Sequence, residues 1–470
     1  MSRLIKNWSY LLFSDITQAI IGFFTFMILA RKLNPEGYGT LNVLLALASV
    51  FSVFAINLSA SQVITREVTL RPNATSNLIK IVFPIRLLSL FISIVGLISY
   101  QAFLGETNYG LIIATCLIVV ATVVWDLAES IAFGHFITKW TTIISISGSL
   151  LWLVIVLLLP ENNLAIDIVV WLYAVVFFLR GSVYIIVSYS KFIQSNNEPS
   201  NINLNAILWM SMPFLWMRVV GIFGEQIPIL FLKGFSGADE VGYFSVGNRL
   251  IIPITMAITT GLRAVFPFMT KLFQDDKEQF SRLLIQGFSF VFIIGGTIAT
   301  ILTVTSGIWL PEIFGAAYQK SIESFNYQAW FGVLLCFDLL LATVLASTYR
   351  QKTLAIITTI DVLIVFPLLY FGAKYGAEGM AIAKLTGALI TIFYHIFVVS
   401  FVLKINLISK TFFLSIGYFA VFMLTSIFVS NIQIKLFIVI VTFLIFMADK
   451  TSPLRNLTLL VSNKLKSKNK

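Results

Sequence analysis

The chain has 470 residues, of which 58% are hydrophobic and only 11% are charged, and its formal net charge is +11. A soluble chain of this length carries about a quarter charged residues, so the composition excludes a soluble globular protein. The abundance of apolar residues also excludes a disordered chain. An integral membrane protein is the class that remains.

Long apolar segments follow one another along the whole chain. A membrane-spanning helix needs about 20 mostly apolar residues, whereas barrel strands alternate apolar and polar residues over about ten positions. The sequence predicts an all-α integral membrane protein with about 14 transmembrane helices. In chain order these segments cover residues 8–30, 40–61, 78–100, 110–133, 141–159, 168–189, 206–232, 246–269, 283–310, 323–349, 353–372, 380–403, 411–430 and 432–448.

The basic residues are distributed unequally between the two sides of the predicted membrane. With a cytoplasmic N-terminus, 19 of the 32 Lys and Arg residues fall in the two terminal stretches and the inward loops, and 6 fall in the outward loops. Because basic residues accumulate on the cytoplasmic side, both termini are predicted to be cytoplasmic. The basic tail 449–470 is expected to touch anionic membrane lipid and not nucleic acid.

A weak internal repeat divides the chain. Residues 34–40 and 239–245 each contain a Gly-Tyr pair with an acid before it and a hydroxyl after it, and the two pairs are 205 residues apart. With six segments in each half, the halves are predicted to be parallel repeats. The predicted domains are a six-helix bundle at 1–190, a second at 206–403, two additional transmembrane helices at 411–448 and the tail at 449–470.

Motifs of soluble enzymes are missing from the sequence. It contains no Walker loop, no His-Glu-x-x-His pattern and no Cys-x-x-Cys pair, and the loops leave no room for an extramembrane catalytic domain. Cys116 and Cys336 lie far apart in apolar stretches and are expected to be inert thiols, and the two histidines are too few for a metal site. We therefore expect no enzyme activity, no cofactor and no metal.

Charged residues inside the apolar segments carry the functional information, because a charge at membrane depth normally faces a partner or a substrate path. Arg180, Arg218 and Arg263 are predicted to line a cavity that accepts an anionic group. For Arg249 and Lys384, the alternative to lining a cavity is that their long side chains extend to the outer membrane–water interface. The acids at depth are Asp15, Asp126, Glu129, Glu225, Asp338 and Asp361. Asp126 and Glu129 lie near a helix end, so simple solvation is the alternative to a functional role for them. For Asp15 the alternative is an ion pair or hydrogen bond with a neighbouring helix.

Several stretches together resemble a known family. They lie at residues 29–47, 237–254, 265–273, 310–321 and 374–387, and read LARKLNPEGYGTLNVLLAL, GADEVGYFSVGNRLIIPI, VFPFMTKLF, LPEIFGAAYQKS and KYGAEGMAIAKLTG. Their order and spacing resemble the polysaccharide transporter branch of the multidrug/oligosaccharidyl-lipid/polysaccharide exporter superfamily, with O-antigen or repeat-unit flippases of the Wzx type most similar. The resemblance implies two six-helix bundles around a central cavity, in the bacterial inner membrane.

The resemblance also implies a function. A flippase of this kind moves undecaprenyl-pyrophosphate-linked oligosaccharide repeat units from the cytoplasmic to the periplasmic leaflet by alternating access, for O-antigen or capsule synthesis. Polymerase and chain-length proteins of the same pathway are the implied partners, and a proton or sodium gradient is the implied energy source. The expected pyrophosphate-binding residues are Arg218, Arg249, Arg263, Arg180, Arg31 and Lys32. The expected coupling-ion residues are Glu225, Asp338, Asp15 and Asp361.

Three alternatives stay open at this point. A drug or cation antiporter of the same superfamily shares the twelve-helix plan without the two added helices. A lipid II flippase shares the fourteen helices and a cationic cavity. A membrane glycosyltransferase or polymerase is the enzyme alternative, although it would be expected to carry a large extramembrane loop with paired acids.

Overall fold

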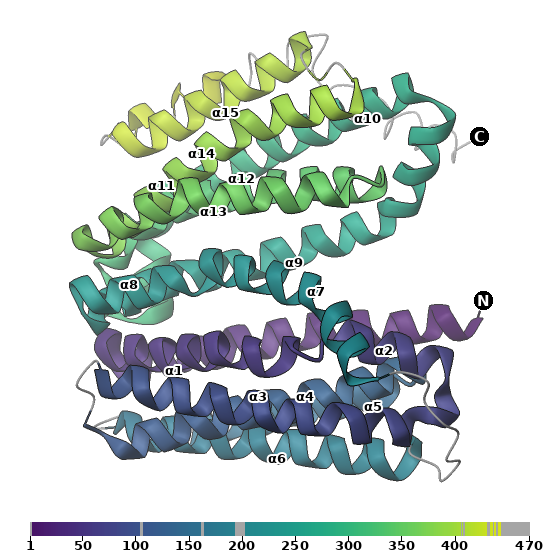
Figure 1. The fold of residues 1–470 in the computed structure, drawn as a ribbon. Coiled ribbons are helices and arrows are strands. Elements are labelled where there is room, and N and C mark those ends of the chain that lie inside the picture. Colours follow the sequence, from purple (N-terminus) through teal and green to yellow (C-terminus); the bar gives the residue numbers. More distant parts are fainter. Residues whose placement is uncertain are drawn as a thin grey trace, which may run out of the picture. The chain divides into compact units, whose positions relative to one another are not determined.

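A computed structural model shows a chain built of helices (Figure 1). It describes residues 2–103, 107–160, 164–192, 203–405, 407, 409–429, 433–435, 437–438 and 440–442. Every regular element in this described part of the chain is helical.

Eleven stretches of the described chain are long and apolar enough to cross a membrane. Two of them, 13–70 and 351–403, have 58 and 53 residues, and each contains two of the predicted segments. Thirteen of the fourteen predicted segments coincide with these stretches, and the fourteenth, 432–448, falls mostly outside the described residues. The prediction of an all-α multi-pass membrane protein is confirmed.

The chain forms two compact units, residues 1–242 and 243–470, which are described separately. The helices that begin in unit 1 are α1 (Ser2–Asn57), α2 (Ser61–Leu70), α3 (Thr75–Phe103), α4 (Tyr109–Gly134), α5 (Lys139–Leu158), α6 (Ile166–Phe192), α7 (Leu204–Glu225), α8 (Ile227–Ser236) and α9 (Ala238–Asp275), which continues into unit 2. Those of unit 2 are α10 (Lys277–Phe290), α11 (Gly296–Phe314), α12 (Ser321–Ser347), α13 (Gln351–Gly372), α14 (Gly376–Leu403) and α15 (Lys410–Phe428). The predicted four-part division of the chain stays a prediction, and its tail lies outside the described residues.

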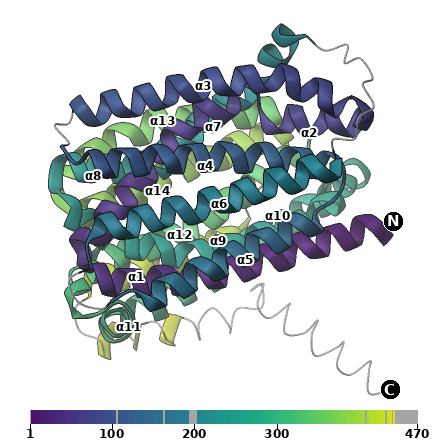
Figure 2. The same cartoon turned by 90° about the horizontal axis from the view of Figure 1, so that it is seen from below.

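Unit 1 is organised around α4. This helix packs along α6 and also contacts α1, α2 and α3, while α5 packs against α1 and α6 (Figure 2). Small and apolar side chains allow this close packing, since Ala128, Ile131 and Ala132 of α4 are fully buried together with Tyr184 of α6. A helix that is apolar on nearly all sides is expected at the centre of a bundle.

Two helix breaks in unit 1 follow directly from proline. Within α1, Asn34 adopts φ 57 and ψ 174, which kinks the chain between the first two predicted segments. The following Pro35 disfavours a helical conformation at the residue before it, and asparagine tolerates a positive φ. The predicted segment 206–232 is likewise two helices, because Pro228 lacks the N–H group needed to continue the helix and lies in the first turn of α8.

The two copies of the Gly-Tyr motif touch each other. A Cβ atom at Gly39 would collide with the backbone carbonyl of Ala238, and one at Gly242 would collide with the carbonyl of Pro35. Gly242 belongs to the second Gly-Tyr pair, whereas Gly39 follows the first pair, Gly37-Tyr38, so the two contacts do not join equivalent positions of the motif. The close approach explains why both positions are glycine.

Unit 2 pairs α12 with α14, and α13 with α14 through the 3₁₀ turn Ala373–Tyr375. Between α10 and α11 the chain runs through a π-helical turn, Val291–Gly295, against which α15 packs. Phe292 of this turn stacks on Phe337 of α12, with 4.7 Å between ring centroids. The extensive pairs α4–α6 and α12–α14 involve the fourth and sixth predicted segments of each half.

Candidate functional site: charged clusters inside the helical units

Arg218 and Glu225 lie on one face of α7, as their spacing predicts. Arg218 Nη1 lies 3.6 Å from a carboxylate oxygen of Glu225, and both side chains are about half exposed. A pair this open is loosely held, because solvent competes for both charges. Arg218 therefore keeps donors available for an anionic ligand.

Arg249 and Arg263 both lie on α9, which is continuous through Pro253. The side chain of Arg249 is partly buried and that of Arg263 is exposed. Their role in binding an anion stays a prediction.

Lys32 has a structural task in unit 1. Its Nζ donates to the backbone carbonyls of Val156, at 3.1 Å, of Leu157, at 3.2 Å, and of Leu159. These are carbonyls at the end of α5, where helix geometry leaves oxygens without a partner and the helix dipole favours a cation. The neighbouring Arg31 is exposed. The assignment of Arg31 and Lys32 to pyrophosphate stays a prediction, with Lys32 engaged in capping a helix.

Arg180 lies inside unit 1 between α4, α5 and α6. Its guanidinium carbon is 3.9 Å from the centroid of the Trp125 ring, and its Nη2 is 3.4 Å from Ser145 Oγ. The aliphatic stem presses against Gly148, where a Cβ would come within 2.6 Å of Arg180 Cδ. Its Nε is buried without a hydrogen-bond partner. A stacked cation with a spare donor is suited to recruiting an acceptor at this position.

Glu129 connects Arg180 with two other acids. It accepts a hydrogen bond from Trp125 and interacts electrostatically with Arg180, Asp126 and Asp15. Glu129 of α4 therefore lies within electrostatic range of Arg180 on α6 and of Asp15 on α1. Asp15 acts on Glu129 as a like charge, and the pairing considered for Asp15 stays a prediction.

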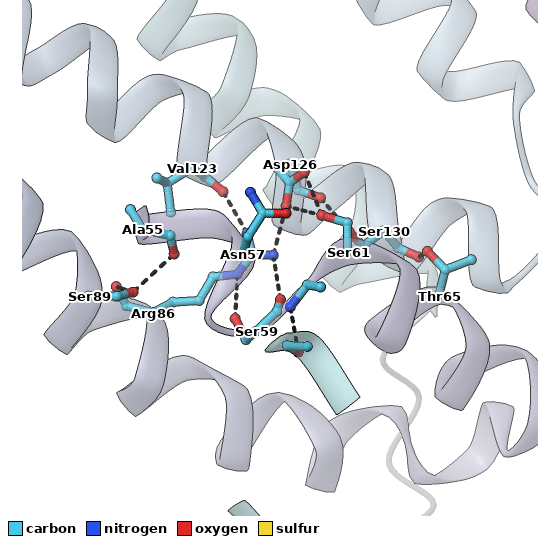
Figure 3. A network of polar contacts seen from close by, with 12 residues as sticks. Ala55, Asn57, Ser59, Ser61, Thr65, Arg86, Ser89, Val123, Asp126 and Ser130 are labelled. Atoms are coloured by element: carbon cyan, nitrogen blue, oxygen red, sulfur yellow. Dashed lines mark hydrogen bonds and ion pairs between the residues drawn. The ribbon is translucent and has the colours of Figure 1, made fainter. Parts of the chain in front are cut away.

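A second cluster of unit 1 is centred on Arg86 of α3, which is only 3% exposed (Figure 3). Its Nη2 lies 2.7 Å from Asp126 of α4, its Nε donates to Ser59 Oγ at 3.1 Å, and its Nη1 donates to the Val123 carbonyl at 3.2 Å. Ser61 also donates to both carboxylate oxygens of Asp126. Because Ser59 lies in the break between α1 and α2 and Ser61 begins α2, this ion pair holds that break in place. Asp126 is therefore paired with the buried Arg86 and is not simply solvated.

Unit 2 contains a histidine between two acids. His395 of α14 places Nδ1 3.0 Å from Asp338 of α12 and Nε2 3.0 Å from Asp361 of α13. Tyr394 donates to Asp361 and lies 3.0 Å from His395 Nε2 through its hydroxyl. Two predicted coupling-ion residues therefore meet at one imidazole that the sequence did not single out.

Lys384 of α14 lies over an aromatic ring, with its Nζ 4.5 Å from the centroid of Phe331. This pair resembles Arg180 over Trp125 in unit 1, and Lys384 follows Arg180 by 204 residues while Phe331 follows Trp125 by 206. Each offset differs by one residue from the 205-residue spacing of the Gly-Tyr motifs. A cation over an aromatic ring thus occurs between α4 and α6 in unit 1 and between α12 and α14 in unit 2.

No group of three or more His, Cys, Asp and Glu is placed to hold a metal ion in the described part of the chain. Cys116 and Cys336 are both free thiols.

Sequence reasoning missed Arg86, His395 and Tyr394 as members of polar clusters. Arg86 lies in an apolar segment, and the rule that intramembrane charges have partners was the available signal. His395 had the same signal, although the partners of both residues lie on other helices far along the chain. Proximity of this kind cannot be read from spacing.

Residues 4–273 match the polysaccharide biosynthesis protein family, and they make up more than half of the chain. A putative O-antigen transporter of Shigella flexneri is 22% identical over 416 residues, which cover 81% of this chain and 94% of that protein. The capsular polysaccharide biosynthesis protein CapF of Staphylococcus aureus is 21% identical over 327 residues, which cover 68% of this chain and 79% of that protein.

Solved structures show which fold the chain shares. The lipid II flippase MurJ in an inward closed conformation has a TM-score of 0.64 at 16% identity, with 94% of this chain and 98% of that chain covered. An inward-facing multidrug resistance MATE family transporter of the MOP superfamily has a TM-score of 0.59 at 16% identity, with 82% and 95% covered. The predicted resemblance is confirmed, and the chain belongs to the polysaccharide biosynthesis protein family of multi-pass membrane proteins.

Proposed function

We propose that the protein is a flippase that moves undecaprenyl-pyrophosphate-linked oligosaccharide repeat units from the cytoplasmic to the outer leaflet of a bacterial cell membrane. The observation that carries the proposal is the similarity to a putative O-antigen transporter along 81% of this chain, together with the family match. The capsular relative supports the same substrate class. The product would serve O-antigen or capsule synthesis.

The physical task requires cations at membrane depth. A sugar head group with a pyrophosphate cannot cross hydrocarbon unaided, because desolvating its charges and hydroxyls costs many kcal/mol. Guanidinium groups match phosphate oxygens in geometry and charge. Arg218 and Arg263 are the candidates for this contact, since both side chains are exposed or half exposed on helices that qualify as membrane spans.

Directional transport needs an energy source and a defined orientation. The absence of a Walker loop from the sequence favours coupling to an ion gradient through acids such as Asp338 and Asp361. The excess of basic residues in the inward loops supports cytoplasmic termini. Alternating access would then expose the loaded protein first to one leaflet and then to the other.

Complementation of a flippase-null strain tests the proposal. The full-length chain is expected to restore surface polysaccharide, and Arg218→Ala and Arg263→Ala are each expected to reduce it at least tenfold. Arg282→Ala is the matched control, because Arg282 is 72% exposed and pairs with Glu278 one turn away. If both membrane variants export as well as the control, the anion-binding role of these arginines is wrong.

The lipid II alternative is separated by a second strain. Cells depleted of their lipid II flippase lyse, and the proposed function predicts that this chain does not prevent lysis. Rescue of that strain without restored surface polysaccharide in the first strain would replace the proposed substrate by lipid II. Restored polysaccharide together with continued lysis supports the proposal.

A further inference from the structure

The imidazole of His395 lies between two carboxylates that come from different helices. Asp338 of α12 faces Nδ1 and Asp361 of α13 faces Nε2, each at 3.0 Å. The histidine is 6% exposed at its side chain, whereas Asp338 is 42% exposed and Asp361 is 21% exposed. One side chain of α14 therefore joins three helices of unit 2.

The hydrogen atoms in this cluster can be counted. A neutral imidazole has one N–H donor and one bare nitrogen, and an ionised carboxylate only accepts. A neutral ring between two ionised acids can form only one of the two hydrogen bonds of His395. Both hydrogen bonds form when the cluster binds one additional proton. Without that proton, a bare nitrogen faces a carboxylate oxygen and one of the two contacts must open. The closed arrangement therefore requires one bound proton.

We propose that His395, clamped between Asp338 and Asp361, is the binding site of the coupling proton, and that loss of this proton opens its contact with Asp338. The coupling role of this proton rests on the proposed function. The existence of the proton site rests only on the geometry of α12, α13 and α14. It assigns to His395 a role that charge counting along the sequence did not suggest.

The exposure of the two acids determines which contact opens. Asp361 keeps a second donor in Tyr394, whose hydroxyl also lies 3.1 Å from the Ile357 carbonyl, so α13 and α14 stay joined. Asp338 has the greater exposure and exchanges its imidazole partner for water at lower cost. The Nδ1–H bond breaks, an O–H bond forms on the Asp338 carboxylate, and that carboxyl passes the proton to water. A neutral ring and two ionised acids remain.

The arrangement favours a proton over a metal or sodium ion. Hard cations need several oxygen ligands converging on one point. Here the two carboxylates lie on opposite edges of a ring, so the space between them is filled by the imidazole. In agreement, these three residues are not among groups able to hold a metal ion in the described chain.

Three titratable groups of the described residues contact the ring. Asp338 faces it from α12, Asp361 from α13, and Tyr394 from its own helix. Lys384 is on the same helix but 11 residues earlier, which places it about 16 Å away along the axis, over Phe331. The turn Ala373–Tyr375, which also packs on α14, lies at the far N-terminal end of that helix. The proton balance of His395 is therefore set by two acids and one hydroxyl.

The chain has only two histidines, which makes a direct test practical. The second, His135, lies just after α4 with its Nε2 3.2 Å from Thr75, and burial lowers its pKa. We would label histidine with ¹⁵N in the full-length protein in lipid bilayers and use His135→Gln to leave a single ring. At about pH 5 both nitrogens of His395 are expected to carry hydrogen, and on raising the pH toward about 10 only Nδ1 is expected to lose it. A ring that is neutral at every pH, or that loses the Nε2 proton first, overturns the proposal.

Transport in cells tests whether the site does the coupling. In the complemented flippase-null strain, His395→Gln is expected to lower surface polysaccharide at least tenfold, and replacing external Na⁺ by K⁺ is expected to change wild-type export less than twofold. Equal export by His395→Gln and wild type, or loss of export without Na⁺, overturns the coupling role while leaving the proposed function intact. Failure of the wild-type chain to complement, with the expected ¹⁵N transition, would instead reject the proposed function and support the proton site.

Discussion

Each unit contains a buried basic side chain that joins three segments of the chain. The two side chains differ in their chemistry. In unit 1, Arg86 links α3 to α4 and to the break between α1 and α2 through Asp126 and Ser59. In unit 2, His395 links α14 to α12 and α13 through two acids. A guanidinium keeps its proton in any protein environment, whereas an imidazole releases its proton near physiological pH. The comparison indicates a permanent lock in unit 1 and a link in unit 2 that depends on a proton.

The burial of the two clusters agrees with this difference. Arg86 is 3% exposed and donates to serine and carbonyl oxygens as well as to Asp126, so its charge is satisfied on several sides. In the cluster of His395, Asp338 is 42% exposed, which agrees with the proposed release of the proton through that carboxyl. A lock benefits from isolation from water, and a proton site cannot work without contact with water. The predictions below test this contrast, beginning with the largest expected effect.

Removing the permanent lock is expected to cost most. Arg86→Ala leaves Asp126 without its buried partner and should reduce the free energy of unfolding by about 3–5 kcal/mol. The exposed pair of Arg282 and Glu278 provides the control, because Arg282→Ala should cost about 0–1 kcal/mol. Thermal unfolding of the detergent-solubilised variants measures both. Similar losses in the two variants would show that Arg86 is no lock.

The close approach of the two glycine-containing segments is tested next. Gly39→Ala and Gly242→Ala each place a methyl group against a backbone carbonyl, of Ala238 and of Pro35 respectively, with an expected cost of about 1–3 kcal/mol. Gly221→Ala is the matched control, since nothing lies within 4 Å of a Cβ at that position in α7. The losses are again measured as shifts in unfolding temperature. A loss at Gly39 and Gly242 no larger than that of the control would contradict the close approach.

The cost of removing the titratable link should depend on pH. At low pH the imidazolium donates to two carboxylates, so His395→Gln should cost about 1.5–3 kcal/mol. The contact with Asp338 exists only while the ring holds its second proton, and the cost should therefore shrink as the pH rises. The cost of Arg86→Ala should not follow pH in this way. Unfolding temperatures of both variants and wild type, measured at about pH 6 and about pH 9, distinguish the two behaviours. Parallel pH curves would remove the contrast between the units.

The stacked cations are expected to give the smallest effect. Arg180→Lys loses the planar contact with Trp125 and should cost about 1 kcal/mol, whereas Lys384→Met should cost about 0.5–1 kcal/mol because it keeps an unbranched stem near Phe331. The order follows from Arg180 being closer to its ring. A larger loss at Lys384 would contradict this order.

Much of the fold could be predicted because it follows from local composition. Thirteen predicted segments coincide with apolar helices, since about 20 apolar residues form a spanning helix whatever surrounds them. The kinks were harder to locate. Pro35 and Pro228 mark helix breaks, whereas Pro84 and Pro213 lie inside continuous helices.

The site could be predicted only in part. The pair of Arg218 and Glu225 was visible from a spacing of seven residues on one helix. Lys32 was assigned to an anionic ligand, although its ammonium caps α5, and no spacing rule links residue 32 to residues 156–159. His395 entered the sequence analysis only as one of two histidines that are too few for a metal site. Its acids arrive from helices that precede it by 57 and 34 residues.

The sequence by itself determined the membrane class, the helical segments, the family resemblance and the expectation that charges at depth have partners. These properties depend on composition and on contacts within one helix, which are local. Only the tertiary structure decided that Asp126 is locked by an arginine while Asp338 and Asp361 share a histidine. Packing between helices chooses those partners, and the identity of the partner determines whether a buried acid belongs to a fixed ion pair or to a site that exchanges a proton.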